Sequence, residues 1–301
     1  MSIQKRSAST RKWTVGRLPD LTGKIIMVTG ATSGIGKEAA REVARRGAHV
    51  VLPSITRAEG ESAAAEIGGS TEVHELDLSR LDAVRAFAAD YTGPIDVLLD
   101  NAGLMSRTRE ETTDGFELHL GVNVLGPFLL TELLLPQIRE RVVITSSMAH
   151  AAGRIDFTDP HFRRRRYSMA AAYAQSKLGC MLWGLDLQNR LRAAGSPVDV
   201  QLAHPGFAAT SILDPTPFPP VNRVLNRIGR GIIPTAADGA RPLLYAATES
   251  LPPASYIGPS GFRQIAGSPG PCERSAAAGD PDLARRFREF AVRETGVDPV
   301  V

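Results

Sequence analysis

The residues with the clearest chemical use are a tyrosine and a lysine four positions apart, in Tyr173-Ala174-Gln175-Ser176-Lys177. On a helix, the phenol and the ammonium lie on the same face, one turn apart. An isolated tyrosine has a pKa of about 10 and is a poor base at neutral pH. A nearby positive charge favours the phenolate and lowers that pKa, so the pair is suited to exchanging a proton with a substrate hydroxyl. Taken alone, the same spacing is also that of an ordinary exposed helix pair.

A second signal is the glycine-rich turn that follows the apolar run from Ile25 to Thr29. Glycine lets a backbone turn tightly and approach a pyrophosphate, while the amides and dipole at a helix start favour negative charge. The spacing is G-x-x-x-G-x-G, and its position directly after a strand predicts a dinucleotide site. The cofactor-binding candidates in this turn are Gly30, Ser33, Gly34, Ile35 and Gly36.

The strands and helices that would position these residues are predicted to alternate along the chain. Short β-branched runs separated by helical patterns predict an α/β fold: a doubly wound parallel sheet, Rossmann-like, in a single domain with helices on both faces. The predicted strands are 24–29, 49–52, 72–76, 95–99, 141–145, 197–203 and 256–258. The predicted helices are 35–46, 58–66, 79–89, 113–138, 170–193 and 235–248, with an added amphipathic helix over 280–295.

Ligands of such sheets bind outside the carboxyl ends of the strands, so residues that follow strands are the best site candidates. Further motifs occur at these positions, and in order they resemble the short-chain dehydrogenase/reductase family over about residues 21–262. By this resemblance Asp77 and Leu78 contact adenine, and Asn101-Ala102-Gly103 is the turn beside the coenzyme. Pro205-Gly206, with Thr210, matches the family's loop near the nicotinamide.

The resemblance also assigns the catalytic residues, namely Asn123, Ser147, Tyr173 and Lys177, and it places Tyr173 and Lys177 against the coenzyme. Ser147 would bond the substrate oxygen, with Ser146 as the competing choice because adjacent strand residues face opposite ways. Asn123 would hold a helix irregularity and a water that links Lys177 to solvent. The spacing of Ser147 and Tyr173, and the stretch 150–157 between them, are similar to the retinol-dehydrogenase-like subgroup, which has an inserted loop here.

Two neighbouring residues are less easily assigned. Asp100 stands where many relatives have a second asparagine, so its hydrogen bonds are not predicted, and His204 is interpreted as structural.

The choice between NAD and NADP depends on the end of the second strand. The stretch from Leu52 to Arg57 lacks an acid that would repel a 2′-phosphate, and Ile55 stands where this subgroup often has arginine. Arg57 or Lys37 would have to reach the phosphate. The sequence thus favours NADP over NAD, with Arg57 as the candidate contact.

The expected substrate is a small hydrophobic alcohol, aldehyde or ketone, whether retinoid-like, steroid-like or fatty. Its wall would come from Leu104, Met105, Met148 and a lid over 207–233 that contains Phe207, Ile212, Leu213, Phe218 and Leu225. Residues 1–20 are interpreted as an N-terminal extension to the oxidoreductase domain 21–301. The family commonly forms dimers or tetramers through the helices that carry Asn123 and Tyr173, so a homo-oligomer is one option.

Composition excludes several other classes. The net charge is +3, from 35 basic and 32 acidic residues, too even a balance to indicate nucleic acid. The run Arg163–Arg166 is interpreted as a solvated loop, with a patch for an acidic partner as the alternative. The two cysteines indicate neither a metal site nor a disulfide framework and fit the cytoplasm. No signal peptide or membrane span is expected.

Two rival functions remain. An epimerase or dehydratase of the extended branch would have a differently spaced glycine turn. A catalytically silent NAD(P)-binding regulatory protein would typically lack Tyr173 or Lys177, and both are present.

Overall fold

The fold is built around one eight-stranded sheet. A computed structural model describes residues 12–206, 235–261 and 264–301. The strands are β1 (Ile25–Val28), β2 (His49–Ser54), β3 (Ser70–Glu75), β4 (Ile95–Asp100), β5 (Ile138–Thr145), β6 (Asp199–Ala203), β7 (Tyr256–Pro259) and β8 (Pro269–Pro271). Their order across the sheet is β3-β2-β1-β4-β5-β6-β7-β8. Strands β1 to β7 are parallel, and β8 pairs antiparallel with β7.

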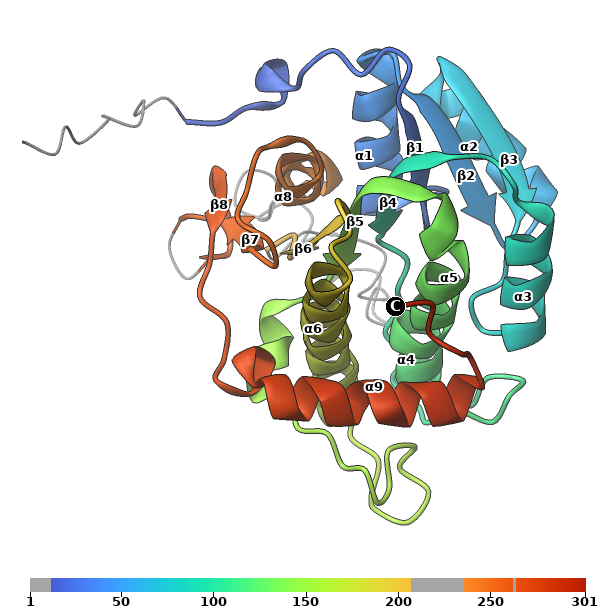
Figure 1. Cartoon of the computed structure of the whole chain (residues 1–301), viewed down its shortest axis with the longest axis vertical. Coiled ribbons are helices and arrows are strands. Elements are labelled where there is room, and N and C mark those ends of the chain that lie inside the picture. The colour runs from blue at the N-terminus through green and yellow to red at the C-terminus, as the bar shows by residue number, and fades with distance from the viewer. Residues whose placement is uncertain (1–11, 207–234, 262–263) are drawn as a thin grey trace, which may run out of the picture.

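Helices cover both faces of this sheet (Figure 1). They are α1 (Gly34–Arg45), α2 (Arg57–Ile67), α3 (Leu81–Asp90), α4 (Leu118–Leu120), α5 (Gly126–Leu134), α6 (Met169–Ala193), α8 (Ala236–Thr248) and α9 (Pro281–Thr295). One apolar core lies between the sheet and α1, α2 and α8, and a second lies between the sheet and α3, α5, α6 and α9. Because both faces are covered, all six residues of β4 are buried. The doubly wound single-domain fold predicted from the sequence is therefore confirmed.

The differences from the predicted elements have local causes. The helix predicted over 113–138 begins only at Leu118, because the Glu117 side chain caps it by accepting from the amides of His119 and Leu120. It is interrupted by a π-helix at Gly121–Leu125 and ends before β5, which starts at Ile138. Strand β8 was not predicted, since Pro-Gly-Pro carries no strand pattern.

The run Arg163–Arg166 agrees with its prediction as a solvated loop, whereas the expected absence of a membrane span stays a prediction. The backbone amides of Arg163, Arg164 and Arg165 all donate to the Asp159 carboxylate, and the Arg163, Arg164 and Arg166 side chains are exposed, which agrees with a solvated loop. Within the described ranges, one helical stretch, Leu118–Gln137, is long and apolar enough to cross a membrane, and 83% of it is buried inside the protein. The lid proposed over 207–233 and Thr210 lie outside the described residues.

Candidate active site

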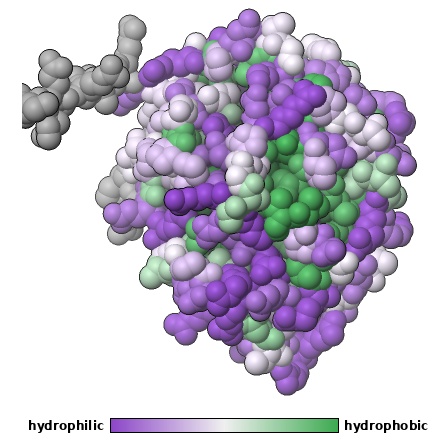
Figure 2. Space-filling view, viewed as in Figure 1, coloured by the Kyte–Doolittle hydropathy of each residue, from purple (hydrophilic) through white to green (hydrophobic). Residues whose placement is uncertain are grey.

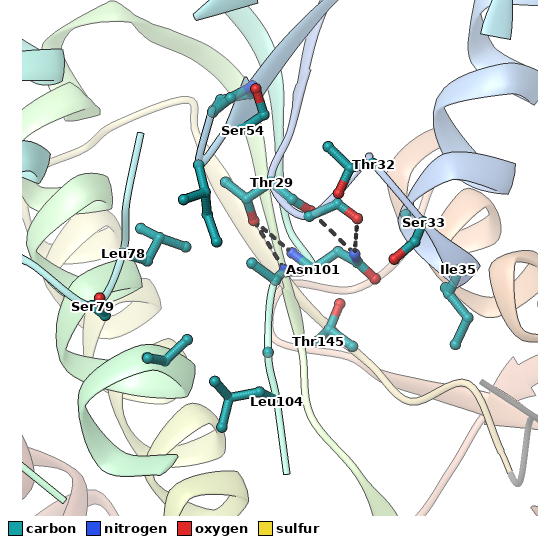
Figure 3. Close-up of a pocket in the computed structure, with 18 of the residues that line it drawn as sticks. Thr29, Thr32, Ser33, Ile35, Ser54, Leu78, Ser79, Asn101, Leu104 and Thr145 are labelled. Atoms are coloured by element: carbon teal, nitrogen blue, oxygen red, sulfur yellow. Dashed lines mark hydrogen bonds between the residues drawn. The ribbon is translucent and has the colours of Figure 1, made fainter. Parts of the chain in front are cut away.

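A cavity of about 460 Å³ opens at the carboxyl ends of the central strands (Figure 3). Polar groups from the ends of β1 and β4 and the start of α1 meet apolar side chains from α4 and the chain after β4. Its lining includes Gly30, Ser33, Gly34, Ile35, Gly36, Asp77, Leu78, Asn101, Ala102, Gly103, Tyr173, Lys177 and Pro205. The structure thus brings together nearly all the cofactor-binding residues that the sequence indicates.

The glycine turn is shaped so that side chains would not fit. Gly30 has φ of +67°, a conformation that favours glycine, and a Cβ on Gly36 would lie 2.2 Å from the Gly30 carbonyl oxygen. The Ser33 side chain makes no capping hydrogen bond to α1, and no acidic residue lies in the first helical turn. The α1 amides and dipole are therefore available to a pyrophosphate, so this turn fits a dinucleotide.

The turn after β4 is fastened to the glycine turn through Thr29 and Asn101. The Asn101 side-chain amide donates to the Thr29 carbonyl oxygen at 3.1 Å, and the Asn101 and Ala102 backbone amides donate to Thr29 Oγ1, each at 3.1 Å (Figure 3). Since these bonds join the ends of β1 and β4, they set the width of the cavity where a coenzyme would cross the sheet.

The far end of the cavity, past β2 and β3, is lined by Ser54, Ile55, Asp77 and Leu78. Asp77 accepts from the amide and hydroxyl of Ser79, at 2.8 and 2.7 Å. Ile55 is 67% exposed.

The two cations expected to help with a 2′-phosphate do not line this cavity. The Arg57 guanidinium lies 3.6 Å from Glu61, one turn along α2, and the Lys37 ammonium lies 2.8 Å from Glu66. Among the described residues, no arginine lines the cavity, so the structure does not bring Arg57 to the place that the sequence analysis gave it.

Helix α6 presents Tyr173 and Lys177 to the cavity, one turn apart. The Lys177 ammonium is buried, donates to the Thr145 carbonyl oxygen at 3.1 Å and lies 5.8 Å from the centre of the Tyr173 ring. Tyr173 is half-buried. The same-face geometry predicted for the pair is present.

Asn123 lies in the π-helix Gly121–Leu125, which agrees with the helix irregularity implied by the family resemblance. Its Oδ1 accepts from the Leu104 amide at 2.7 Å, and its Nδ2 donates to the Leu104 carbonyl oxygen and to Ser176 Oγ. Asn123 thereby joins the chain after β4 to α6. The expected water between Asn123 and Lys177 stays a prediction.

The two serines after β5 differ in what their hydroxyls contact. Ser146 is buried and donates to the Lys177 carbonyl oxygen at 2.9 Å. Ser147 is half-buried and caps a short 3₁₀-helix, Met148–Ala152, where its Oγ accepts from the Ala149 amide. Within the described part of the chain the Ser147 hydroxyl hydrogen has no acceptor. Ser147 is not among the cavity-lining residues, so its predicted contact with substrate is not tested.

The loop after β6 is held by a buried histidine. His204 Nδ1 accepts from the Gly206 amide at 3.2 Å, and burial lowers the pKa of His204 to about 4. Gly206 has φ of +74°, and a Cβ there would lie 2.4 Å from the Ile265 carbonyl oxygen. These contacts agree with the structural role expected for His204.

Sequence reasoning missed two cavity-lining residues on the helix before Asn123. Leu118 and Val122 line the cavity from one helical face, which their four-residue spacing could have indicated. It also missed a buried pair next to Tyr173, formed by Glu117 and His119.

Comparisons with known proteins agree with this geometry. A family model described as short chain dehydrogenase matches residues 24–217. The chain is 40% identical over 296 residues to a Mus musculus protein named polyprenol dehydrogenase, covering 93% of this chain and 86% of the relative. It is 40% identical over 248 residues to Homo sapiens retinol dehydrogenase 12, covering 78% of this chain and 77% of that protein.

Solved structures are similar over comparable lengths. A crystal structure of an uncharacterized protein from Mycobacterium Paratuberculosis is 40% identical with a TM-score of 0.85, and the match covers 97% of this chain and 100% of that one. A crystal structure of a candidate NAD(P)-dependent gluconate 5-dehydrogenase from Beutenbergia cavernae, with NADP bound at low occupancy, is 29% identical, with a TM-score of 0.58, over 76% of this chain and 91% of that one. The chain therefore belongs to the short-chain dehydrogenase family, in its retinol-dehydrogenase-like branch, and is an oxidoreductase that uses NAD(P).

Proposed function

We propose that this enzyme interconverts a hydrophobic alcohol and its carbonyl compound, and that Tyr173 exchanges the proton of the reacting oxygen. The observation that carries the proposal is the buried Lys177 ammonium, 5.8 Å from the Tyr173 ring centre. A fixed positive charge beside a phenol stabilises its ionised form, which a proton acceptor needs. The nicotinamide, when bound, supplies or accepts the hydride.

The other site residues would act by orientation. Asn123 fixes the chain around Leu104 through two hydrogen bonds, at 2.7 and 3.0 Å, so this wall of the site is held against α6. We assign the contact with the substrate oxygen to Ser147, because the Ser146 hydroxyl is already bonded to α6. In oxidation, Tyr173 would take the substrate proton; in reduction, it would return that proton.

The substrate class is a hydrophobic alcohol, with long isoprenoid primary alcohols as the first candidates. Apolar Leu104 lines the cavity, and the two methionines expected in the substrate wall, Met105 and Met148, are half-buried but are not among its lining residues. The names of the relatives, polyprenol and retinol dehydrogenase, support an isoprenoid alcohol over a steroid or a fatty alcohol.

For the coenzyme, we infer that NAD and NADP are discriminated weakly. The strand end that should discriminate presents Ser54 and the exposed Ile55, neither of which carries a charge. No acid there repels a 2′-phosphate, which favours NADP. However, the two cations that could bind this phosphate, Arg57 and Lys37, are paired with Glu61 and Glu66. Titration of the protein with NADH and NADPH measures the ratio of the two dissociation constants; a ratio above about 100-fold, near 3 kcal/mol, contradicts weak discrimination.

The test of the reaction is Tyr173→Phe, assayed with retinal, a polyprenal, a steroid ketone and a fatty aldehyde against both reduced coenzymes. Loss of the phenol hydroxyl should lower kcat by about 10²- to 10⁴-fold, the usual size of a general acid–base contribution, while coenzyme binding is retained. Tyr91→Phe is the matched control, because it removes a phenol hydroxyl that does not line the cavity and that donates to the Pro94 carbonyl oxygen.

Two outcomes contradict the proposal. If Tyr173→Phe turns over substrate at a rate close to that of wild type, Tyr173 is not the residue that exchanges the proton. Coenzyme binding by the wild type without turnover of any carbonyl compound would instead favour the silent regulatory protein.

A further inference from the structure

A buried polar cluster, Glu117, His119 and Tyr167, lies beside Tyr173 and has no part in the chemistry proposed above. The Glu117 and His119 side chains have no solvent exposure. The His119 ring centre is 6.0 Å from that of Tyr173, with the planes at 71°, an edge-to-face contact. Tyr173 therefore has His119 beside its ring as well as the Lys177 ammonium.

Hydrogen bonds fix both the orientation and the protonation of His119. The Ser106 backbone amide donates to His119 Nε2 at 3.0 Å, so Nε2 carries no proton. The proton is therefore on Nδ1, which lies 2.6 Å from Glu117 Oε1 and donates to it. Rotating the imidazole about the His119 Cβ–Cγ bond would break both hydrogen bonds. The ring orientation relative to Tyr173 is therefore fixed.

Glu117 is itself held in place as an anion. Its two oxygens accept from the His119 and Leu120 backbone amides at 3.1 and 2.9 Å, and the Tyr167 hydroxyl lies 3.3 Å from Oε1. Burial acts to raise the pKa of Glu117, but the hydrogen bonds that it accepts from the His119 ring and from the backbone amides hold that pKa below its usual value. An ionised carboxylate with this many donors has little freedom to move.

The cluster joins three segments that form the active site. Ser106 belongs to the chain after β4, two residues beyond Leu104. Glu117 and His119 begin the helix that leads to Asn123, and Tyr167 belongs to the inserted loop that enters α6 ahead of Tyr173. A displacement in any one segment is therefore transmitted to His119 and to the ring next to it.

We propose that His119, held by Glu117 and Tyr167, is a positioning residue that keeps the Tyr173 hydroxyl aligned for proton transfer. This inference rests on the proposed function, in which Tyr173 exchanges the proton. The physical reason is that a displacement of about 1 Å in a reacting group can slow a reaction by about 100-fold, even when binding is intact. In this role His119 contacts neither the substrate nor the proton that Tyr173 exchanges with it.

The test variant is His119→Asn. The asparagine Nδ2 occupies the place of Nδ1 and still donates to Glu117, so the buried carboxylate keeps its partner while the part of the ring beyond Nδ1 is removed. The matched control is His74→Gln on β3. His74 Nε2 lies 2.6 Å from Glu72, its ring is edge-on to Tyr91 at 5.5 Å, and glutamine retains the bond to Glu72 while removing that edge contact.

With retinal as the probe, His119→Asn should lower kcat by about 10- to 100-fold. The dissociation constant of the reduced coenzyme should not change. The solvent isotope effect on kcat should rise, because proton transfer becomes slower relative to the other steps, and a loss of stability alone does not produce that change. His74→Gln should leave kcat and the isotope effect as in wild type. Tyr167→Phe, which removes one donor near Glu117, should lower kcat in the same direction by less.

An unchanged kcat and isotope effect in folded His119→Asn overturns the inference, as does a loss of activity that only parallels a loss of folded protein. If His119→Asn does not fold, Tyr167→Phe decides by the same criteria. Tyr173→Phe separates this inference from the function on which it rests. If Tyr173→Phe is inactive and His119→Asn is normal, only the positioning role fails; if Tyr173→Phe is active, the proposed function fails.

Discussion

At the scale of single residues, Asp100 places a carboxyl group in the core directly before the Asn101 turn. Thr131 Oγ1 donates to Asp100 Oδ2 at 2.7 Å, while Oδ1 is buried with no hydrogen-bond partner in the described part of the chain. Burial raises the pKa of Asp100 to about 7. The folded protein thus binds a proton here more tightly than the unfolded chain, in which an aspartate titrates near 3.9.

The sign of the resulting pH dependence follows from linkage. A folded-state pKa above the unfolded value makes stability fall as pH rises from about 4 to about 7, by up to about 4 kcal/mol from this group, with no further loss above that range. Asp100→Asn removes the charge, so we expect the variant to be more stable than wild type at pH 8 and the advantage to shrink toward pH 4. Urea midpoints across this pH range measure the difference.

Asp96→Asn on the same strand is the control for this experiment. Asp96 is also buried, but its carboxylate accepts from the Ile25 amide at 2.7 Å. A stability gain that is the same at pH 4 and pH 8 in Asp100→Asn would mean that ionisation of Asp100 is not its cause.

At the scale of elements, α9 supports the helix that carries Tyr173 and Lys177. It crosses the lower part of α6 in Figure 1, and the Phe287 ring packs against Gly179 of α6, where a Cβ would lie 2.8 Å from the ring. Arg288 adds an ion pair with Asp186 at 3.3 Å. Because Gly179 is only two residues from Lys177, this contact supports the part of α6 that faces the cavity.

Phe287→Ala should therefore lower the free energy of unfolding by about 3–5 kcal/mol, the usual cost of emptying a fully buried phenylalanine site. Chemical denaturation measures this change in the free energy of unfolding. Arg285→Ala on the exposed side of α9, where the side chain pairs with the exposed Asp282 at 3.0 Å, should cost less than about 1 kcal/mol. Equal costs for the two variants would show that the face of α9 turned to α6 does not stabilise the fold.

Much of this element structure could be predicted from the sequence, for identifiable reasons. Strand β1 and the central parts of β2, β4 and β5 are apolar runs bounded by turns, and the glycine turn and the Tyr173–Lys177 spacing are local patterns. Strand β8 could not be predicted, because its pairing with β7 is a tertiary contact that Pro-Gly-Pro does not encode.

The direction of side chains at the site was harder to predict than the elements. The position of Arg57 after β2 suggested a coenzyme contact, yet Arg57 begins α2 and its side chain follows the helix toward Glu61. The Glu117–His119 pair was missed because a Glu-x-His spacing signals nothing until Tyr167 and Ser106 are brought to it from distant parts of the chain. The predicted lid, the substrate contact of Ser147 and the cytoplasmic location stay predictions.

At the scale of the whole molecule, two tryptophans report separately on the two sides of the sheet. Trp13 packs edge-on against Tyr245 of α8 and donates to Glu249 at 2.7 Å, whereas Trp183 of α6 packs against Phe128 on the opposite face. These are the only tryptophans in the chain. Because both cores share one sheet, we expect them to unfold together.

Trp13→Phe and Trp183→Phe each leave one reporter. In both variants the fluorescence transition in denaturant should coincide with the loss of helical circular dichroism in the same sample. Separate transitions in either variant would show that one layer of helices unfolds without the other.

The surface bears on the expected homo-oligomer. Helix α9 lies against α6, one of the two helices that the family resemblance assigns to association, while Figure 2 shows an apolar area in the region of α5 that α9 leaves uncovered. Association through α5 and α6 together is therefore obstructed by the chain's own C-terminal helix, and the homo-oligomer stays a prediction.

The last strand of the sheet affects how copies of the protein meet one another in a concentrated solution. An exposed sheet border with unpaired amides is a template on which another chain can add a strand and begin to aggregate. At one of the two borders the outer strand is β8, three residues long, and the prolines at its first and last positions have no amide hydrogen to donate to an added strand. A short motif that is not part of the cavity lining thus helps to keep neighbouring molecules from polymerising edge to edge.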